Sequence, residues 1–128
     1  MDAYGGVGLF AATLDRDATI VEQSPSSVFD ARHNVPGAKV VQSDVARWRP
    51  SPAALVVADP PRIGLGPAAV DVLSRTGTSH LVLVSCDPAA LARDARLLAG
   101  AGFEHVGTTL VDLFPHTPHV ETVTRFIR

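Results

Sequence analysis

Apolar residues fall in short runs along the chain, separated by turns that contain glycine, proline or charged residues. The runs at 53–58 and 80–84 are almost continuously apolar rather than alternating, which is typical of strands covered on both faces in a parallel sheet. Further runs predict strands at 18–21, 39–42, 103–111 and 120–127, with the last one antiparallel. Strands interleaved with helices in this way predict a doubly wound α/β domain.

Two segments between these runs carry helix-capping signals. Ser24-Pro25 and Asp87-Pro88 each place an N-cap side chain before a proline at the first helical position. We therefore predict helices over 25–34 and 89–99, the second of them ended by Gly100.

Acidic side chains and the single cysteine stand where the predicted strands end. In doubly wound domains the carboxyl ends of the parallel strands meet at one edge of the sheet, and ligands bind there. We therefore expect five residues that are far apart in the sequence to gather at one rim: Asp2, Glu22, Asp44, Asp59 and Cys86.

The composition limits the classes of protein to consider. With 128 residues, 46% of them apolar, residues 1–128 are assigned to one domain. The sequence has neither a signal peptide nor an apolar run long enough to span a bilayer, which predicts a soluble, cytoplasmic protein. One cysteine excludes an internal disulfide and the thiolate sets of structural zinc or iron–sulfur sites. A net charge of −2 lacks the positive footprint of a free-standing nucleic-acid binder.

The chain opens on a glycine-rich turn, Asp2-Ala3-Tyr4-Gly5-Gly6-Val7-Gly8, between a short strand and a helix. Glycines there permit positive φ and let a ligand approach the backbone. A plain tight turn and a dinucleotide site are the alternatives. An acid before the turn repels a pyrophosphate but suits a cationic sulfonium, which favours S-adenosylmethionine over NAD as the cofactor. Glu22 is placed to hold ribose hydroxyls, and Asp44 is either a partner of the adenine amino group or a surface-turn carboxylate.

Three further segments are more specific. They are Asp59-Pro60-Pro61-Arg62-Ile63-Gly64, Val84-Ser85-Cys86-Asp87-Pro88 and the stretch over 111–121 that ends at Glu121. In this order, and with the glycine-rich turn, they resemble the signature motifs of the RNA 5-methyluridine methyltransferases, which include the tRNA and ribosomal RNA uracil-5 methyltransferases. The resemblance spans nearly the whole chain. It implies a class I, Rossmann-like, S-adenosylmethionine-dependent methyltransferase domain that acts on RNA.

The resemblance also implies a role for each motif. Cys86 is the nucleophile that adds to carbon 6 of uracil, and the N-terminus of the helix after it favours the thiolate. Glu121 is the general base that removes the proton from carbon 5. Asp59 orients the uracil edge, while Arg62 either binds a phosphate or anchors its loop. The expected cofactor contacts are Asp2, Tyr4, Gly6, Gly8, Glu22, Asp44 and Asp59.

The chain departs from the family in places. Gly5 stands where the family commonly has cysteine, and the ligands of the iron–sulfur cluster found in some relatives are missing. Because the chain begins almost on the glycine-rich turn, we expect most of the first strand to be missing, along with the RNA-binding regions that precede it in full-length relatives. We interpret the chain as a piece of a longer enzyme or a degenerate paralogue, with RNA contacts supplied largely from elsewhere.

Two other interpretations are weighed against this one. A non-catalytic remnant would bind S-adenosylmethionine weakly or dock on a partner. A base-amino or small-molecule methyltransferase would typically carry an aromatic residue where Arg62 stands, and the Cys86 and Glu121 motifs count against it. His116 and His119 flank a proline and lack a third ligand, so we assign them to a loop and predict no metal site.

Overall fold

The computed structural model describes residues 1–14, 17–113, 115–117 and 120–128. Its strands are β1 (Asp2–Ala3), β2 (Thr19–Glu22), β3 (Lys39–Gln42), β4 (Leu55–Ala58), β5 (His80–Ser85), β6 (Glu104–Val111) and β7 (Glu121–Ile127). Its helices are α1 (Leu9–Leu14), α2 (Pro25–Asn34), α3 (Gly66–Ser74) and α4 (Pro88–Gly100), with a 3₁₀ turn, η1, at Val45–Arg47. The predicted strands and both predicted helices are confirmed; α3 and η1 were not foreseen.

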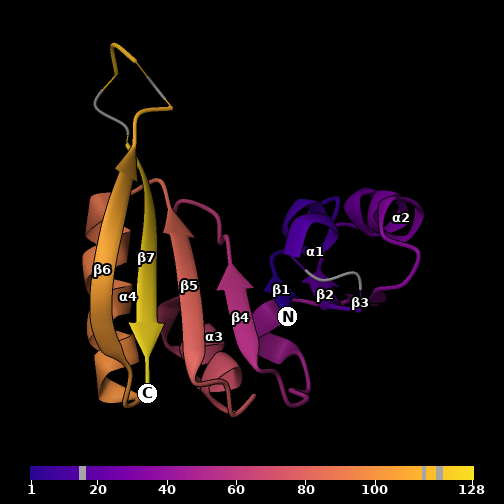
Figure 1. The fold of residues 1–128 in the computed structure, drawn as a ribbon, viewed down its shortest axis with the longest axis horizontal. Coiled ribbons are helices and arrows are strands. Elements are labelled where there is room, and N and C mark those ends of the chain that lie inside the picture. The colour runs from indigo at the N-terminus through magenta and orange to yellow at the C-terminus, as the bar shows by residue number, and fades with distance from the viewer. Residues whose placement is uncertain (15–16, 114, 118–119) are drawn as a thin grey trace.

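The strands form one sheet in the order β3-β2-β1-β4-β5-β7-β6 (Figure 1). Neighbouring strands from β3 to β5 are parallel, and β7 is antiparallel to both β5 and β6. This confirms the doubly wound α/β fold with an antiparallel last strand. The first strand, at two residues, is short but lies in the middle of the sheet.

The sheet is covered differently on its two faces. One face packs against α3, α4 and η1 around a core that includes Leu73, Leu98 and Phe126. A smaller core, including Ile20 and Ala31, lies under α1 and α2. In Figure 1, α3 and α4 lie behind β4, β5, β7 and β6, and no helix lies in front of these strands. No described helix is long and apolar enough to cross a membrane.

The capping signals act as the sequence predicts. The Ser24 hydroxyl accepts the Ser27 N–H at 3.5 Å, and the Asp87 carboxylate accepts the Ala90 N–H at 2.7 Å. The predicted end of α4 was one residue early. The helix includes Gly100, and Gly102, with φ of +88°, reverses the chain toward β6.

Candidate active site

The carboxyl ends of the parallel strands bring the candidate residues to one rim. Across the sheet, β3 leads to Asp44, β2 ends at Glu22, β4 leads to Asp59 and β5 leads to Cys86. Glu121, at the start of antiparallel β7, reaches the same edge. Two regions meet here. We call β1–β3 with α1 and α2 the cofactor half, and β4–β7 with α3 and α4 the chemical half.

Asp2 lies beneath the glycine-rich turn and not on its surface. The residue is 1% exposed, and its Oδ2 accepts the Ala11 N–H in α1 at 3.1 Å. Its Oδ1 is buried without a hydrogen-bond partner among the described residues. Burial, helped by the charges of Asp59 and Glu22, raises the pKa of Asp2 to about 6. Its carboxylate shapes the turn and adds negative charge below it.

The glycines of the turn have different surroundings. Gly6 has a φ of +52°, and a Cβ built on it meets nothing within 4 Å, so the space above it is free for a ligand. Gly8 has a φ of +90°, and a Cβ there would lie 2.9 Å from Cγ2 of Val35. Gly6 therefore opens the rim, whereas Gly8 lets α2 pack against the turn.

Tyr4 has a left-handed backbone conformation, which is more usual for glycine. Its φ is 61°, a conformation that costs energy for an aromatic residue and is found at functional sites. The side chain packs against the larger core. Burial first, and then the charges of Asp44 and Asp94, raise the pKa of Tyr4 to about 12, so the hydroxyl remains protonated.

Two more carboxylates of the cofactor half are engaged by backbone amides. Glu22 accepts the Gly6 N–H through Oε2 at 3.0 Å and the Ser24 N–H through Oε1 at 2.7 Å. Asp44 is exposed and accepts the Ala46 N–H at 2.9 Å as the cap of η1. A carboxylate oxygen accepts more than one hydrogen bond, so both groups can still receive ligand hydroxyl or amino donors. This acidic set around an open glycine fits a cationic cofactor.

Asp59 and Glu121 form the acidic part of the chemical half. Their strands, β4 and β7, flank β5, which places them on the two sides of Cys86 along the rim. Burial raises the pKa of Asp59. Burial and then the charge of Asp59 raise the pKa of Glu121, and Glu121 Oε1 is buried with no partner among the described residues. A carboxylate in this setting is poised to take up a proton.

Cys86 sits in a tightly held bend. The Thr122 hydroxyl donates to the Ser85 carbonyl at 2.7 Å and ties the end of β5 to β7. The Ser85 hydroxyl donates a hydrogen bond to the Asp87 carbonyl at 3.2 Å, and α4 begins at Pro88. Cys86 is a free thiol of intermediate exposure directly before a capped helix, as the sequence predicts.

The loop after β4 is anchored by residues that were not among the predicted site residues. Arg62 is exposed and makes no hydrogen bond or ion pair with the described residues, so it is not the anchor. Asp94 of α4 instead accepts the Leu65 N–H at 2.6 Å and the Gly66 N–H at 3.2 Å. An acid on the buried stripe Ala90, Asp94, Leu98 was the available signal, because such a position normally carries an apolar residue.

Other predictions concern the loop before β7. His116 has a φ of 65° and is exposed, whereas Phe114, Pro118 and His119 lie outside the described residues. The described part of the chain holds no cluster of three or more residues suited to a metal ion.

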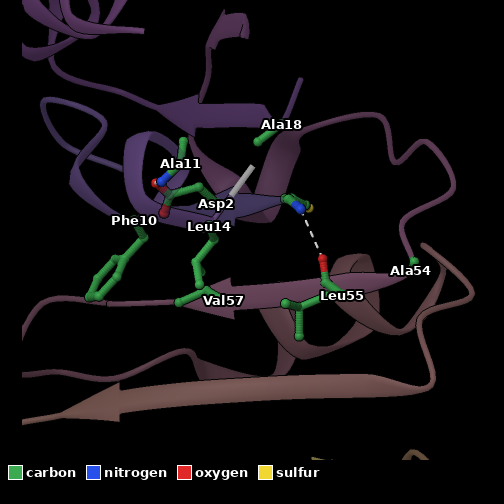
Figure 2. A pocket seen from close by; sticks show the side chains of 9 residues that line it. Asp2, Phe10, Ala11, Leu14, Ala18, Ala54, Leu55 and Val57 are labelled. Atoms are coloured by element: carbon green, nitrogen blue, oxygen red, sulfur yellow. Dashed lines mark hydrogen bonds between the residues drawn. The ribbon is translucent and has the colours of Figure 1, made fainter. Parts of the chain in front are cut away.

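A cavity of about 340 Å³ lies away from the rim, near the starts of β1 and β4. Figure 2 shows Phe10 and Leu14 of α1 reaching toward Val57 on β4, with Asp2 at the back. The Met1 amino group donates to the Leu55 carbonyl at 2.8 Å beside it. Asp2 lines this cavity, whereas Glu22, Asp59, Cys86 and Glu121 do not, so the cavity meets the candidate active site at Asp2 and not in the chemical half.

The chain is also similar in sequence to known proteins. Residues 50–127 match the sequence model of the family described as tRNA (uracil-5-)-methyltransferase. The chain is 40% identical to an uncharacterised RNA methyltransferase of Nitratidesulfovibrio vulgaris, over 95% of this chain and 30% of that protein. It is 34% identical to a 23S rRNA (uracil(1939)-C(5))-methyltransferase of Pseudomonas entomophila, over 98% of this chain and 31% of that protein.

A solved structure is similar over almost the same span. It is the Pyrococcus abyssi tRNA (uracil-54, C5)-methyltransferase in complex with S-adenosyl-L-homocysteine, with a TM-score of 0.88 and 32% identity. The similarity covers 98% of this chain and 33% of that one. The chain thus spans about a third of the length of these relatives.

Proposed function

Since the chain belongs to the tRNA (uracil-5-)-methyltransferase family, we propose that residues 1–128 are its S-adenosylmethionine-dependent catalytic domain and methylate carbon 5 of a uridine in RNA. The observation that carries the proposal is the arrangement along the rim, where Cys86 lies between Asp59 and Glu121 beside an open glycine-rich turn. Relatives named for transfer RNA and 23S ribosomal RNA support RNA as the substrate class.

The cofactor site in this proposal is the turn of the cofactor half. Gly6 leaves space for the ligand, Glu22 and Asp44 receive its hydroxyl and amino donors, and the buried charge of Asp2 favours a cation. S-adenosylmethionine, when bound, supplies an electrophilic methyl group. A solved relative holds S-adenosyl-L-homocysteine, which supports this choice.

The chemical half acts on the base. The Cys86 thiolate forms a bond to carbon 6, and the electron pair of the carbon 5–carbon 6 double bond moves toward carbon 5, which becomes nucleophilic. Carbon 5 would then take the methyl group as the bond between that group and the sulfonium sulfur breaks, with S-adenosyl-L-homocysteine as the leaving group, and Glu121 accepts the proton from carbon 5. The electrons of the bond between carbon 5 and that proton restore the double bond as the sulfur–carbon 6 bond breaks. The unpartnered Oε1 and raised pKa of Glu121 suit a proton acceptor.

Asp59 and Arg62 complete the substrate site in this proposal. Asp59 accepts or donates a hydrogen bond at the polar edge of uracil, since base-modifying enzymes read an unstacked base through that edge. Arg62 is free to contact an RNA phosphate, because the loop is anchored by Asp94 and Arg93. With a net charge of −2, the domain depends on further contacts for its grip on RNA.

The test uses 5-fluorouracil RNA, in which fluorine replaces the proton that Glu121 removes and so traps the adduct. The chain is incubated with S-adenosylmethionine and 5-fluorouracil forms of transfer RNA or of a 23S ribosomal RNA segment, and covalent protein–RNA species are resolved under denaturing conditions. We expect an adduct with the unchanged chain and none with Cys86→Ser. Asp71→Asn, on the exposed face of α3, serves as the surface control and retains the adduct.

Calorimetry with S-adenosyl-L-homocysteine accompanies this test. If the unchanged chain binds this ligand but forms no adduct with either RNA at concentrations that saturate it with RNA, the enzymatic proposal is wrong and a non-catalytic remnant is favoured. If Cys86→Ser still forms the adduct, the assignment of the nucleophile is wrong.

A further inference from the structure

The loop between β4 and α3 carries the proposed substrate contacts and has its backbone held from another helix. Residues 59–66 begin with Asp59 at the rim and end at Gly66, the first residue of α3. Leu65, the N-cap residue of α3, provides no side-chain hydrogen bond for the first turn. The backbone N–H groups at this helix start donate instead to Asp94, which lies 29 residues after Leu65 in the chain.

Asp94 is placed for this task by α4. It is 1% exposed and stands on the buried face of the helix, where an unpaired carboxylate is costly. Its Oδ2 accepts the Leu65 N–H at 2.6 Å, and its Oδ1 accepts the Gly66 N–H at 3.2 Å. The carboxylate therefore caps α3 from outside, and its charge faces the positive end of that helix.

Arg93 and Gly64 close the same junction. Arg93 pairs with Asp94 Oδ1 at 3.2 Å and also donates to the Ile63 carbonyl. Gly64 has a φ of +80°, and a Cβ built on it would overlap the Asp94 carboxylate and lie 2.6 Å from Nη2 of Arg93. The loop thus fits against α4 at a distance that a larger residue at position 64 would prevent.

The helix that makes this junction is the one that follows the nucleophile. α4 begins at Pro88, two residues after Cys86, and its first turn is fixed by the Asp87 cap. Since α4 is continuous from Pro88 to Gly100, a loop attached at Asp94 is held at a fixed position relative to Cys86. The attachment joins the two parts of the chemical half that act on the same base.

We propose that Asp94 is a positioning residue, which clamps the loop over 59–66 to α4 and so fixes Asp59 and Arg62 relative to Cys86. This inference rests on the proposed function, because it assigns those residues to one substrate. Displacement of a positioned group by about 1 Å can cost about a hundredfold in rate, so the clamp affects chemistry without touching the base.

The experiment compares Asp94→Asn with a matched control, Thr78→Val. Thr78 is fully buried, and its hydroxyl donates to the carbonyls of Ala54 and His80 near the opposite edge of the sheet. Both changes remove buried polar contacts, but only Asp94 contacts the loop. Adduct formation with 5-fluorouracil RNA is measured against RNA concentration, per folded molecule and below the melting temperature of each variant.

We expect the maximal rate to fall about tenfold or more in Asp94→Asn and to change less than about twofold in Thr78→Val. An unchanged rate in Asp94→Asn, or an equal loss in both variants, overturns the proposal. Arg93→Ala, which retains the carboxylate but removes the bond to Ile63, is expected to show a smaller loss. If Asp94→Asn does not fold, an unchanged rate in Arg93→Ala overturns the proposal.

Amide hydrogen exchange gives a readout that does not depend on activity. The Leu65 and Gly66 amides are expected to be protected in the unchanged chain and to exchange about tenfold faster in Asp94→Asn, with no change at Val28 in α2. Rapid exchange of both loop amides in the unchanged chain contradicts the clamp. If the unchanged chain forms no adduct, the proposed function fails, and the exchange result decides the clamp separately.

Discussion

The two halves of the rim use their carboxylates in opposite ways. In the cofactor half, Asp2, Glu22 and Asp44 accept hydrogen bonds from backbone amides and so fix the shape of the turns around them. In the chemical half, no described residue distant in sequence donates a hydrogen bond to Asp59 or Glu121, and burial raises the pKa of both. Glu22 holds two amides as expected of a preformed ligand site, whereas Asp59 and Glu121 stay available as expected of a proton-transfer site. Asp2, with one oxygen bonded and the other unpartnered among the described residues, lies between the two.

The largest expected effect is that of changing Glu121, which should impair the chemical half and leave the cofactor half intact. Replacing Glu121 with Gln removes the proton acceptor and keeps the size of the side chain, so methylation turnover is expected to fall by about 10² to 10⁴. Rapid-quench measurement of methyl transfer to normal uridine RNA tests this. Cysteine adduct formation and S-adenosyl-L-homocysteine affinity are expected to persist. Loss of cofactor affinity in Glu121→Gln would contradict the division into halves.

Within the cofactor half, Gly8→Ala and Gly6→Ala are expected to differ. At Gly8 the positive φ and the contact with Val35 together cost about 2 to 5 kcal/mol of unfolding free energy. At Gly6 the backbone cost of about 1 to 2 kcal/mol acts alone, but the new methyl group enters the proposed ligand space. Denaturant unfolding and calorimetry with S-adenosyl-L-homocysteine measure the two effects. Equal ligand affinity in Gly6→Ala and the unchanged chain would place the cofactor elsewhere.

Asp2→Asn tests whether a buried acid with one unpartnered oxygen among the described residues costs stability. Burial raises the pKa of Asp2 from its ordinary value of 3.8 to about 6, so the folded state binds the proton more tightly than the unfolded state. Stability from this group is present below pH 3.8 and is lost as the pH rises through about 6, by at most about 3 kcal/mol. Asp2→Asn keeps the bond from Ala11 and is expected to be more stable at pH 7.

The measurement for Asp2→Asn is chemical denaturation between pH 4 and pH 8. The unchanged chain should lose stability relative to the variant across that window, and cofactor affinity should fall in the variant. A constant difference in stability across the window would mean that Asp2 does not titrate as its burial predicts.

The smallest expected effect concerns Asp59 and its influence on the pKa of Glu121. The charge of Asp59 contributes to the raised pKa of Glu121, after burial. Asp59→Asn therefore should move the acidic limb of the pH–rate profile toward lower pH, because Glu121 must be ionised to accept a proton. The rate of methyl transfer is measured from pH 5 to pH 9. A limb that moves to higher pH, or not at all, would show that Asp59 does not act on Glu121.

Local signals predicted most of the fold. The continuous apolar runs placed β4 and β5, and the Ser24-Pro25 and Asp87-Pro88 pairs placed the starts of α2 and α4, because strand and helix preferences depend on near neighbours. The motifs also identified the candidate site, since strand ends of parallel sheets gather at one edge. Helix α3 was missed because its N-cap residue, Leu65, carries no capping side chain.

The sequence by itself determined which residues reach the rim and which chemistry their types suit: the thiol of Cys86 and the carboxylates of Asp59 and Glu121. The tertiary structure decided the use of each carboxylate. Glu22 is joined to an amide 16 residues away and Asp94 to one 29 residues away, while Glu121 Oε1 is left without a partner among the described residues. Such contacts form between distant parts of the chain that packing brings together, and no local pattern encodes them.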